Sequence, residues 1–405
     1  MILNNEVFWV KELDEHLLVL DKQSAELHVL NPTASVIFLL LVDQELSLLD
    51  LISEYKTIIG NINVAEQDIA SLIKNWQKQN WLSTHNSHYT LRSETNQSLP
   101  PSKRAQFLPP KTELPKVNHS EDFYIKLQCR TKCLIHFISA KDNNFPDAIP
   151  RLKAILAGLE TSSTETDNQV ELTFLTNGEK IYVKTPEYVI VTSDESFGLS
   201  SLATAILQHS YHDRNPFATI HAAALGYNEH CIILPGSSGS GKSTLSGYLA
   251  AKGWEYFGDD VVALGKRENK VEILPFCTSV GLKPGSWEIL KPYYPQIDKL
   301  PVIPYADRKA RFIKVSPPIM TKVYKHKILF PKYTPSATTP SIIKASKIDA
   351  LKAIINSGLT TGLAPNSNNL ECVLDFLGTT DCYFFSYNCL TEAGLRLEEL
   401  CHAKT

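Results

Sequence analysis

The sequence from Cys231 to Thr244 is CIILPGSSGSGKST, an apolar run followed at once by a loop rich in glycine and serine. Its spacing G-x-x-x-x-G-K-S is that of a P-loop, and residues 245–251 after it suit a helix. A buried strand that leads into such a loop and then into a helix is the context this motif requires. An ordinary glycine and serine turn seldom places Lys-Ser at this offset. The stretch therefore predicts an α/β domain that binds a nucleoside triphosphate.

The residues of this loop have predicted tasks in phosphate binding. Glycines let successive backbone N–H groups turn toward one anion, and the positive N-terminal end of the next helix adds to the attraction. We expect Lys242 to reach the β- and γ-phosphates and Ser243 to ligate Mg²⁺. The motif predicts ATP and Mg²⁺ as cofactors but leaves GTP open as the nucleotide. The expected nucleotide-binding residues are Gly236, Ser237, Ser238, Gly239, Ser240, Gly241, Lys242, Ser243 and Thr244.

Two adjacent acids, Asp259 and Asp260, follow one helix after the loop. We expect a helix over residues 243–252 and a strand over residues 254–257 beside the first strand, which would deliver both carboxylates to the nucleotide end of the sheet. One carboxylate would hold Mg²⁺ and the other would accept a proton from an incoming hydroxyl, as in a kinase. The alternative is a turn with both acids in solvent.

Order, spacing and residue types in three segments resemble the catalytic core of HPr kinase/phosphorylase and related kinases. The segments are His221-Ala-Ala-Ala-Leu, the P-loop, and Gly253-Trp-Glu-Tyr-Phe-Gly-Asp-Asp-Val-Val. The resemblance implies an ATP-dependent kinase in which His221 lies near the transferred phosphoryl group. It also implies that one of Asp259 and Asp260 is the proton acceptor while the other assists Mg²⁺. We expect Ser243 and Asp260 as the metal ligands, although the sequence leaves the two aspartates interchangeable.

The resemblance covers about residues 120–400 and departs from the family at one place. Residues 274–283 are LPFCTSVGLK, where the family has a Glu-x-Arg-Gly-x-Gly signature. The chain therefore resembles a divergent branch of these kinases. The departure puts in doubt a glutamate metal ligand, HPr as the substrate and reverse phosphorolysis.

Residues 1–92 resemble PqqD-like precursor-peptide recognition domains, with a winged-helix α+β fold. The resemblance rests on the following segments: three short strands over 7–13, 17–21 and 25–30, the helix start Leu30-Asn-Pro-Thr-Ala-Ser, and helices over 48–55 and 64–81. It implies that a leader peptide adds as a strand to the sheet edge, between strand 25–30 and helix 64–81. A generic winged-helix fold is the alternative. DNA binding is disfavoured because helix 64–81 has few basic residues.

The rest of the chain divides into a linker and a kinase domain. Residues 93–120 gather prolines and lose apolar periodicity, which predicts a linker, and residues 121–405 form the predicted kinase domain. Between Lys299 and Lys332 there are nine Lys or Arg residues and one acid, Asp307. One of them, with Arg308 as the first candidate, is expected to neutralise charge on the transferred group. A solvated basic face is the alternative, and Lys283 is a further candidate.

The 405 residues carry a net charge of −3, so no global attraction draws the chain to nucleic acid or to a membrane surface. No stretch has the length or hydropathy of a signal peptide or membrane span, and we expect a cytoplasmic protein and a possible homo-oligomer. The combined hypothesis is an ATP-dependent kinase that phosphorylates a Ser or Thr hydroxyl of a precursor peptide or protein held by the N-terminal domain. The alternatives are a kinase for a small sugar or alcohol and a nucleotide-gated peptide carrier without phosphotransfer.

Overall fold

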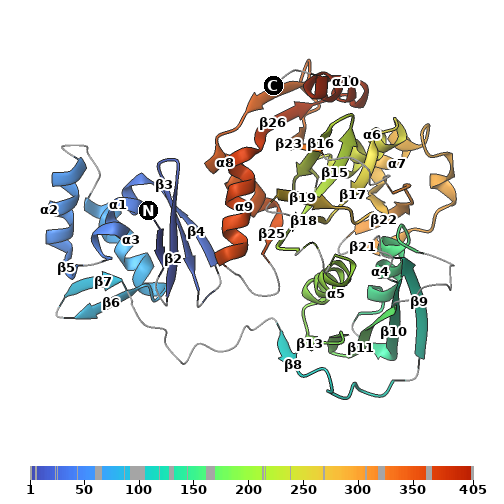
Figure 1. Cartoon of the computed structure of the whole chain (residues 1–405), viewed down its shortest axis with the longest axis horizontal. Helices are drawn as coiled ribbons and strands as arrows, with labels where there is room; N and C mark the ends of the chain where they lie inside the picture. Colours follow the sequence, from blue (N-terminus) through green and yellow to red (C-terminus); the bar gives the residue numbers. More distant parts are fainter. Residues whose placement is uncertain are drawn as a thin grey trace. The chain divides into compact units, whose positions relative to one another are not determined.

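The computed structural model is a mixed α/β structure with several sheets, and it divides into two compact units, Met1–Pro100 and Pro101–Thr405 (Figure 1). In the described part of the chain, no helix has the length and hydropathy needed to cross a membrane. The structure describes residues 2–4, 7–22, 24, 26–42, 44–59, 66–85, 87–91, 105–117, 119–126, 132–143, 145–160, 169–211, 214, 216–237, 239–267, 270–305, 308–317, 324–361 and 367–402.

The N-terminal unit begins with an antiparallel sheet in the order β1-β2-β3-β4. Its strands are β1 (Ile2–Asn4), β2 (Phe8–Leu13), β3 (His16–Asp21) and β4 (Glu26–Leu30). Helix α1 (Pro32–Leu40) follows directly, and the Asn31 side chain caps it by accepting a hydrogen bond from the Ala34 N–H at 2.8 Å. The predicted strands and helix start are confirmed, and β4 lies at the sheet edge with β3 as its partner.

Two more helices and a small sheet complete this unit. They are α2 (Leu48–Ile59), α3 (Glu66–Lys78), and strands β5 (Leu46–Ser47), β7 (His88–Leu91) and β6 (Leu82–His85) in that spatial order. Helix α3 is shorter than the predicted 64–81 at its C-terminal end. Asn80 adopts a left-handed conformation with φ 56°, which ends the helix, and the Trp81 N–H bonds back to the Trp76 carbonyl. Rings of Phe8, Phe38, Trp76 and Trp81 pack together in the core.

The first half of the larger unit is a six-stranded sheet with helices α4 (Ala148–Leu156) and α5 (Glu195–Ser210). Its order is β8 (Gln106–Leu108), β13 (Val189–Thr192), β12 (Lys180–Lys184), β11 (Gln169–Gly178), β10 (Lys132–Asn143) and β9 (His119–Lys126). Part of the predicted linker 93–120 belongs to this sheet, because β8 lies within it and pairs with β13. Residues 93–104 of that linker lie outside the described residues.

The second half is built on another six-stranded sheet, in which β16, β23 and β26 run parallel side by side. The order is β17 (Glu255–Gly258), β15 (Ala222–Tyr227), β16 (His230–Pro235), β23 (Lys325–Tyr333), β26 (Asp381–Tyr387) and β24 (Ser341–Lys344). We expected β17 directly beside β16, which is wrong: β15 lies between them and pairs antiparallel with both. Strand β17 still runs in the direction of β16, so the two strands end at the same edge.

Helices and two small sheets surround this central sheet. Helix α6 (Lys242–Ala251) contacts both α7 (Pro284–Leu290) and α10 (Leu390–His402), as Figure 1 shows in the upper part of this unit. Helices α8 (Lys347–Gly358) and α9 (Ser367–Thr379) pack against each other. The small sheets are β19 (Lys270–Leu274), β18 (Val262–Arg267), β14 (Ala218–Ile220) and β25 (Leu359–Thr360), and β20 (Val280–Leu282), β22 (Arg308–Ile313) and β21 (Ile303–Tyr305).

Candidate functional site

The glycine and serine loop lies between β16 and α6, as its sequence predicts. Gly239 and Gly241 both have φ of 93°, a left-handed conformation that side chains disfavour. At Gly241 a Cβ atom would also lie 2.3 Å from the Tyr387 hydroxyl oxygen. Helix α6 begins at Lys242, with Gly241 as its N-cap. Ser238, one of the predicted nucleotide-binding residues, lies outside the described residues.

Two tyrosines from the ends of neighbouring parallel strands hold the loop. The backbone N–H of Tyr333, at the end of β23, donates to the Ser240 carbonyl at 3.0 Å. The hydroxyl of Tyr387, at the end of β26, donates to the Gly241 carbonyl at 3.1 Å. Because a trans peptide directs its C=O and N–H in opposite directions, fixing these carbonyls on one side turns the next N–H groups to the other side. The loop is thereby prepared to present N–H groups to an anion.

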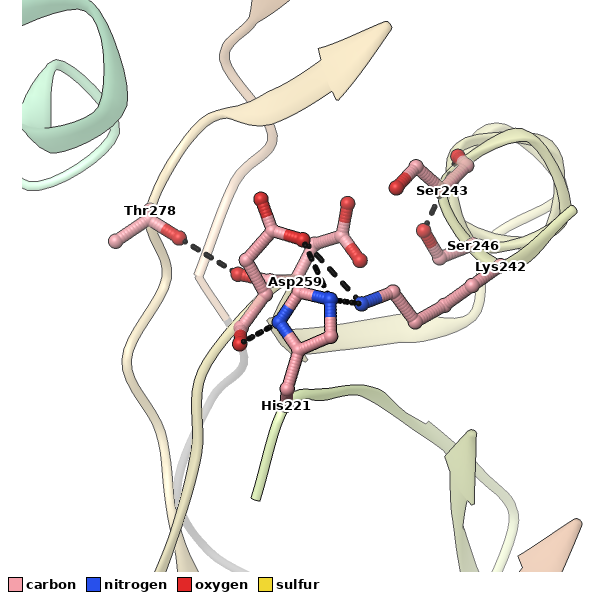
Figure 2. Close-up of polar contacts among 7 residues, drawn as sticks. His221, Lys242, Ser243, Ser246, Asp259 and Thr278 are labelled. Carbon is pink, nitrogen blue, oxygen red and sulfur yellow. Dashed lines mark hydrogen bonds and ion pairs between the residues drawn. The ribbon is translucent and has the colours of Figure 1, made fainter. Parts of the chain in front are cut away.

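His221, Lys242 and Asp260 form one hydrogen-bonded cluster next to the loop. Figure 2 labels His221 and Lys242 and draws their polar contacts as dashed lines. The Lys242 Nζ lies 3.0 Å from His221 Nε2 and 3.3 Å from Asp260 Oδ1. The His221 Nδ1 lies 3.0 Å from the backbone carbonyl oxygen of Asp260. A carbonyl oxygen only accepts, so Nδ1 carries the proton and Nε2 accepts from the Lys242 ammonium. The three side chains predicted to act together therefore meet.

The charges in this cluster favour a neutral histidine and an ionised aspartate. Burial and then the positive charge of Lys242 lower the pKa of His221. Burial alone would raise the pKa of Asp260, but the positive charge of Lys242, which also donates a hydrogen bond to this carboxylate, outweighs burial and lowers that pKa. The side chain of Lys242 is 5% exposed, whereas that of Asp260 is 33% exposed. Asp260 is thus an ionised carboxylate with access to solvent.

Asp259 occupies the opposite environment. The residue is 1% exposed, and neither carboxylate oxygen has a hydrogen-bond partner of normal geometry within the described residues. Burial, followed by the negative charge of Asp260, raises the pKa of Asp259 to about 7, while Lys242 and the Ser243 hydroxyl offset part of the rise. Figure 2 shows this carboxylate beside Ser243. A buried acid without full hydrogen bonding is costly to a fold, which makes it a strong candidate for a functional group.

The backbone around the two aspartates is held by residues 276–278. The Phe276 N–H donates to the Phe257 carbonyl at 2.7 Å, and the Thr278 hydroxyl donates to the Asp259 carbonyl at 3.1 Å. Asp260 adopts φ 68°, an unusual left-handed conformation for a residue with a side chain. This turn sends the two neighbouring carboxylates in different directions, one to the cavity and one to the interior.

A cavity of about 610 Å³ opens above the loop. Its volume is within the range of sites for small-molecule ligands and cofactors. Lys283 lines it and adds positive charge that acts on both His221 and Asp260. The lining residues are His221, Ser237, Gly239, Ser240, Gly241, Lys242, Ser243, Thr244, Asp260, Gly281, Lys283, Gly285, Ser286, Ile289, Tyr293, Ala310, Phe312, Tyr333, Tyr387, Asn388, Leu390 and Thr391.

The basic segment contributes less than its sequence suggests. Arg308 begins β22, but its side chain lies outside the described part of the structure, so its role stays a prediction. Arg311 contacts the Asp298 carboxylate at 3.1 Å and lies over the Trp287 ring at 4.2 Å, which gives it a structural partner. Lys283, the other sequence candidate, lines the cavity together with Lys242.

Sequence reasoning missed the tyrosines of the loop and the apolar cavity wall. Tyr333 and Tyr387 are the last residues of two parallel strands, and the carboxyl ends of such strands meet at one edge of a sheet. That rule, applied to the β-like runs of residues 327–330 and 383–387, would have pointed to Tyr387 and to the residues just after Phe330. Ile289 and Leu390 carry no signal of this kind, because their place depends on how helices pack around α6.

The donor set near Ser243 suits Mg²⁺. A serine hydroxyl and one buried carboxylate, completed by phosphate oxygens and water, are the ligands that this ion takes in phosphoryl-transfer sites. The carboxylate oxygens of Asp259, which lie beside Ser243 and lack a hydrogen bond of normal geometry within the described residues, fit this role better than Asp260, whose Oδ1 contacts Lys242. Within the described residues, no cluster of three or more His, Cys, Asp or Glu side chains forms a separate all-protein metal site.

Comparison with known proteins finds structural similarity at a low level. No protein-family model matches the sequence, and no curated protein matches it. Among solved structures, the chain is similar to the Hpr(Ser) kinase/phosphatase from Coxiella burnetii. The TM-score is 0.22 and the sequence identity 14%, over 45% of this chain and 97% of that chain.

Proposed function

We propose that the chain is an ATP-dependent kinase that transfers the γ-phosphoryl group to a Ser or Thr hydroxyl of a precursor peptide or protein. One observation carries the proposal: the loop lysine Lys242, the neutral His221 and the ionised Asp260 meet at a cavity, directly beside the buried Asp259. Phosphoryl transfer needs phosphate positioning, charge neutralisation and a proton acceptor, and these residues supply each of them.

Asp260 is the proton acceptor in this proposal because it lines the cavity and is ionised. Nucleotide phosphates compete for Lys242 and draw its ammonium away from the Asp260 carboxylate. The freed carboxylate accepts the proton of the acceptor hydroxyl as the hydroxyl oxygen bonds to the γ-phosphorus and the bond to the ADP oxygen breaks. His221 keeps its bond to the Asp260 carbonyl and so holds the left-handed turn in place.

Ser243 and Asp259 would hold Mg²⁺ when it is bound. The ion would supply positive charge to the phosphate oxygens. In this assignment Asp259 replaces Asp260 as the expected metal ligand, because Asp259 cannot reach a substrate from its buried position. Lys283 adds a second positive charge at the cavity, where charge develops on the transferred group.

The N-terminal unit would hold the peptide in this proposal. Strand β4 has a strand partner on one side, within the described residues, and an edge of that kind can pair with an added strand. On β4, His28 packs edge-to-face against the buried Trp81 at 4.7 Å between ring centroids, which anchors this edge strand to the core. Binding a remote leader segment raises the local concentration of a weak hydroxyl acceptor.

The test is incubation of the full chain with Mg-ATP and an arrayed library of peptides, each made as a Ser or Thr form and as its Ala form. We expect a gain of one phosphoryl group on Ser or Thr peptides alone, absent with Lys242→Ala and reduced at least a hundredfold with Asp260→Asn. ADP release stimulated by small sugars or alcohols but by no peptide would reject the peptide acceptor. Binding of ATP without any transfer would reject the kinase.

A further inference from the structure

The cavity over the loop has two chemically different parts. Lys242, Asp260 and Lys283 are its charged lining residues, and together with the neutral His221 they lie at the end where the γ-phosphate is expected. The rest of the described wall carries apolar, hydroxyl, amide and backbone groups. The phosphate chain of a nucleotide would occupy the charged end, and the uncharged part of the cavity would remain empty unless another part of the ligand filled it.

The uncharged part lies over the first turn of α6, between α7 and α10. The Tyr248 ring packs against Tyr293 at 5.2 Å between centroids, and a Cβ at Gly394 would lie 3.1 Å from that same Tyr248 ring. Thr244 is one turn before Tyr248, on the same face of α6. Its Oγ1 lies 2.5 Å from the Ser286 Oγ, at the first turn of α7. The cavity thus continues over Thr244 with one helix on each flank.

Ile289 and Leu390 form the two sides of this continuation. Ile289 lies four residues before Tyr293, and Leu390 lies four residues before Gly394. Each is therefore about one helical turn closer to the loop than the residue that contacts Tyr248. Both side chains line the cavity, and Ile289 is 49% exposed. The two residues therefore face the space above Thr244 from opposite flanks.

We infer that the purine base of the nucleotide lies in this slot, between Ile289 and Leu390. The inference rests on the proposed nucleotide binding. Lys242 fixes the terminal phosphates at the charged end of the cavity, and the loop amides bind the phosphates nearer to the nucleoside. The nucleoside therefore extends from the loop over Thr244. A flat ring between two branched aliphatic side chains buries apolar area on both faces. It would also cover the exposed Ile289 without requiring a charged partner.

Titration calorimetry of the full chain with two probes tests the slot, using Mg-ATP and Mg-tripolyphosphate, which has no base. For Leu390→Ala and Ile289→Ala we expect the Kd of ATP to rise about tenfold, with the tripolyphosphate Kd unchanged within about twofold. Leu395→Ala is the matched control, because Leu395 lies on the same helix, is 58% exposed and does not line the cavity. This control should change neither Kd.

Each other result overturns the inference. Parallel weakening of both probes would mean that Ile289 and Leu390 shape the phosphate loop rather than hold a base. Unchanged ATP binding in both variants would place the base elsewhere, and selective loss of ATP binding in Tyr333→Ala would place it over Tyr333. Failure of the wild-type chain to bind either probe would reject the proposed nucleotide site itself. Thermal unfolding of each variant shows that it is folded.

Discussion

The pair Asp259 and Asp260 allows a direct test of the electrostatics, because the same substitution should have opposite effects at neighbouring positions. Burial raises the pKa of Asp259 from 3.8 to about 7. Between these pH values the native state binds more protons at this group than the unfolded state does, so the free energy of unfolding falls as the pH rises. The loss begins near pH 4 and is complete above pH 7, and it amounts to about 4 kcal/mol.

Asp259→Asn removes this loss because the side chain stays neutral at every pH. Without nucleotide and Mg²⁺, the variant should match the wild type near pH 4 and be more stable by about 4 kcal/mol at pH 8. Asp260→Asn is the matched control. Lys242 lowers the pKa of the Asp260 carboxylate, so the native state favours its ionised form. Replacing the carboxylate by a neutral amide should therefore reduce the free energy of unfolding at pH 8.

Urea unfolding at pH 4, 6 and 8 in EDTA measures these differences. Both single substitutions are compared with the wild type at each pH, so titration of all other groups cancels to first order. An Asp259→Asn variant that is less stable than the wild type at pH 8 would refute the reasoning. A stability gain that is the same at every pH would do so as well, because it would not come from ionisation.

Three further predictions concern the loop and the N-terminal unit. Tyr387→Phe removes the hydroxyl that holds the Gly241 carbonyl, and should raise the Kd of Mg-ATP about fivefold in calorimetry, whereas Tyr383→Phe, on the same strand, should not change it. Gly241→Ala should weaken ATP binding at least tenfold, because φ of 93° and the nearby Tyr387 oxygen leave no room for a methyl group; an unchanged Kd would contradict the loop geometry. Asn31→Ala should lower the free energy of unfolding of the N-terminal unit by about 1 kcal/mol in urea, because it removes the cap of α1; equal stability would mean that the cap contributes nothing.

The sequence by itself determined the features that depend on neighbouring residues. The strand, loop and helix around Lys242, the cap at Asn31 and the short strands of the N-terminal unit follow from local hydrogen bonding, glycine backbone freedom and apolar spacing. The meeting of Lys242, Asp260 and His221 was also expected, since the segments that carry them were recognised together.

Tertiary structure decided which segments became neighbours. A sequence does not state strand order, and so the placement of β15 between β16 and β17, and of β8 in a sheet instead of a linker, depends on long-range pairing. The same holds for the burial of Asp259 and the exposure of Asp260: one left-handed residue separates their environments, and only the surrounding core sets the pKa of each. The cavity wall at Ile289 and Leu390 comes from two helices about a hundred residues apart in sequence, which both reach this cavity because both pack against α6.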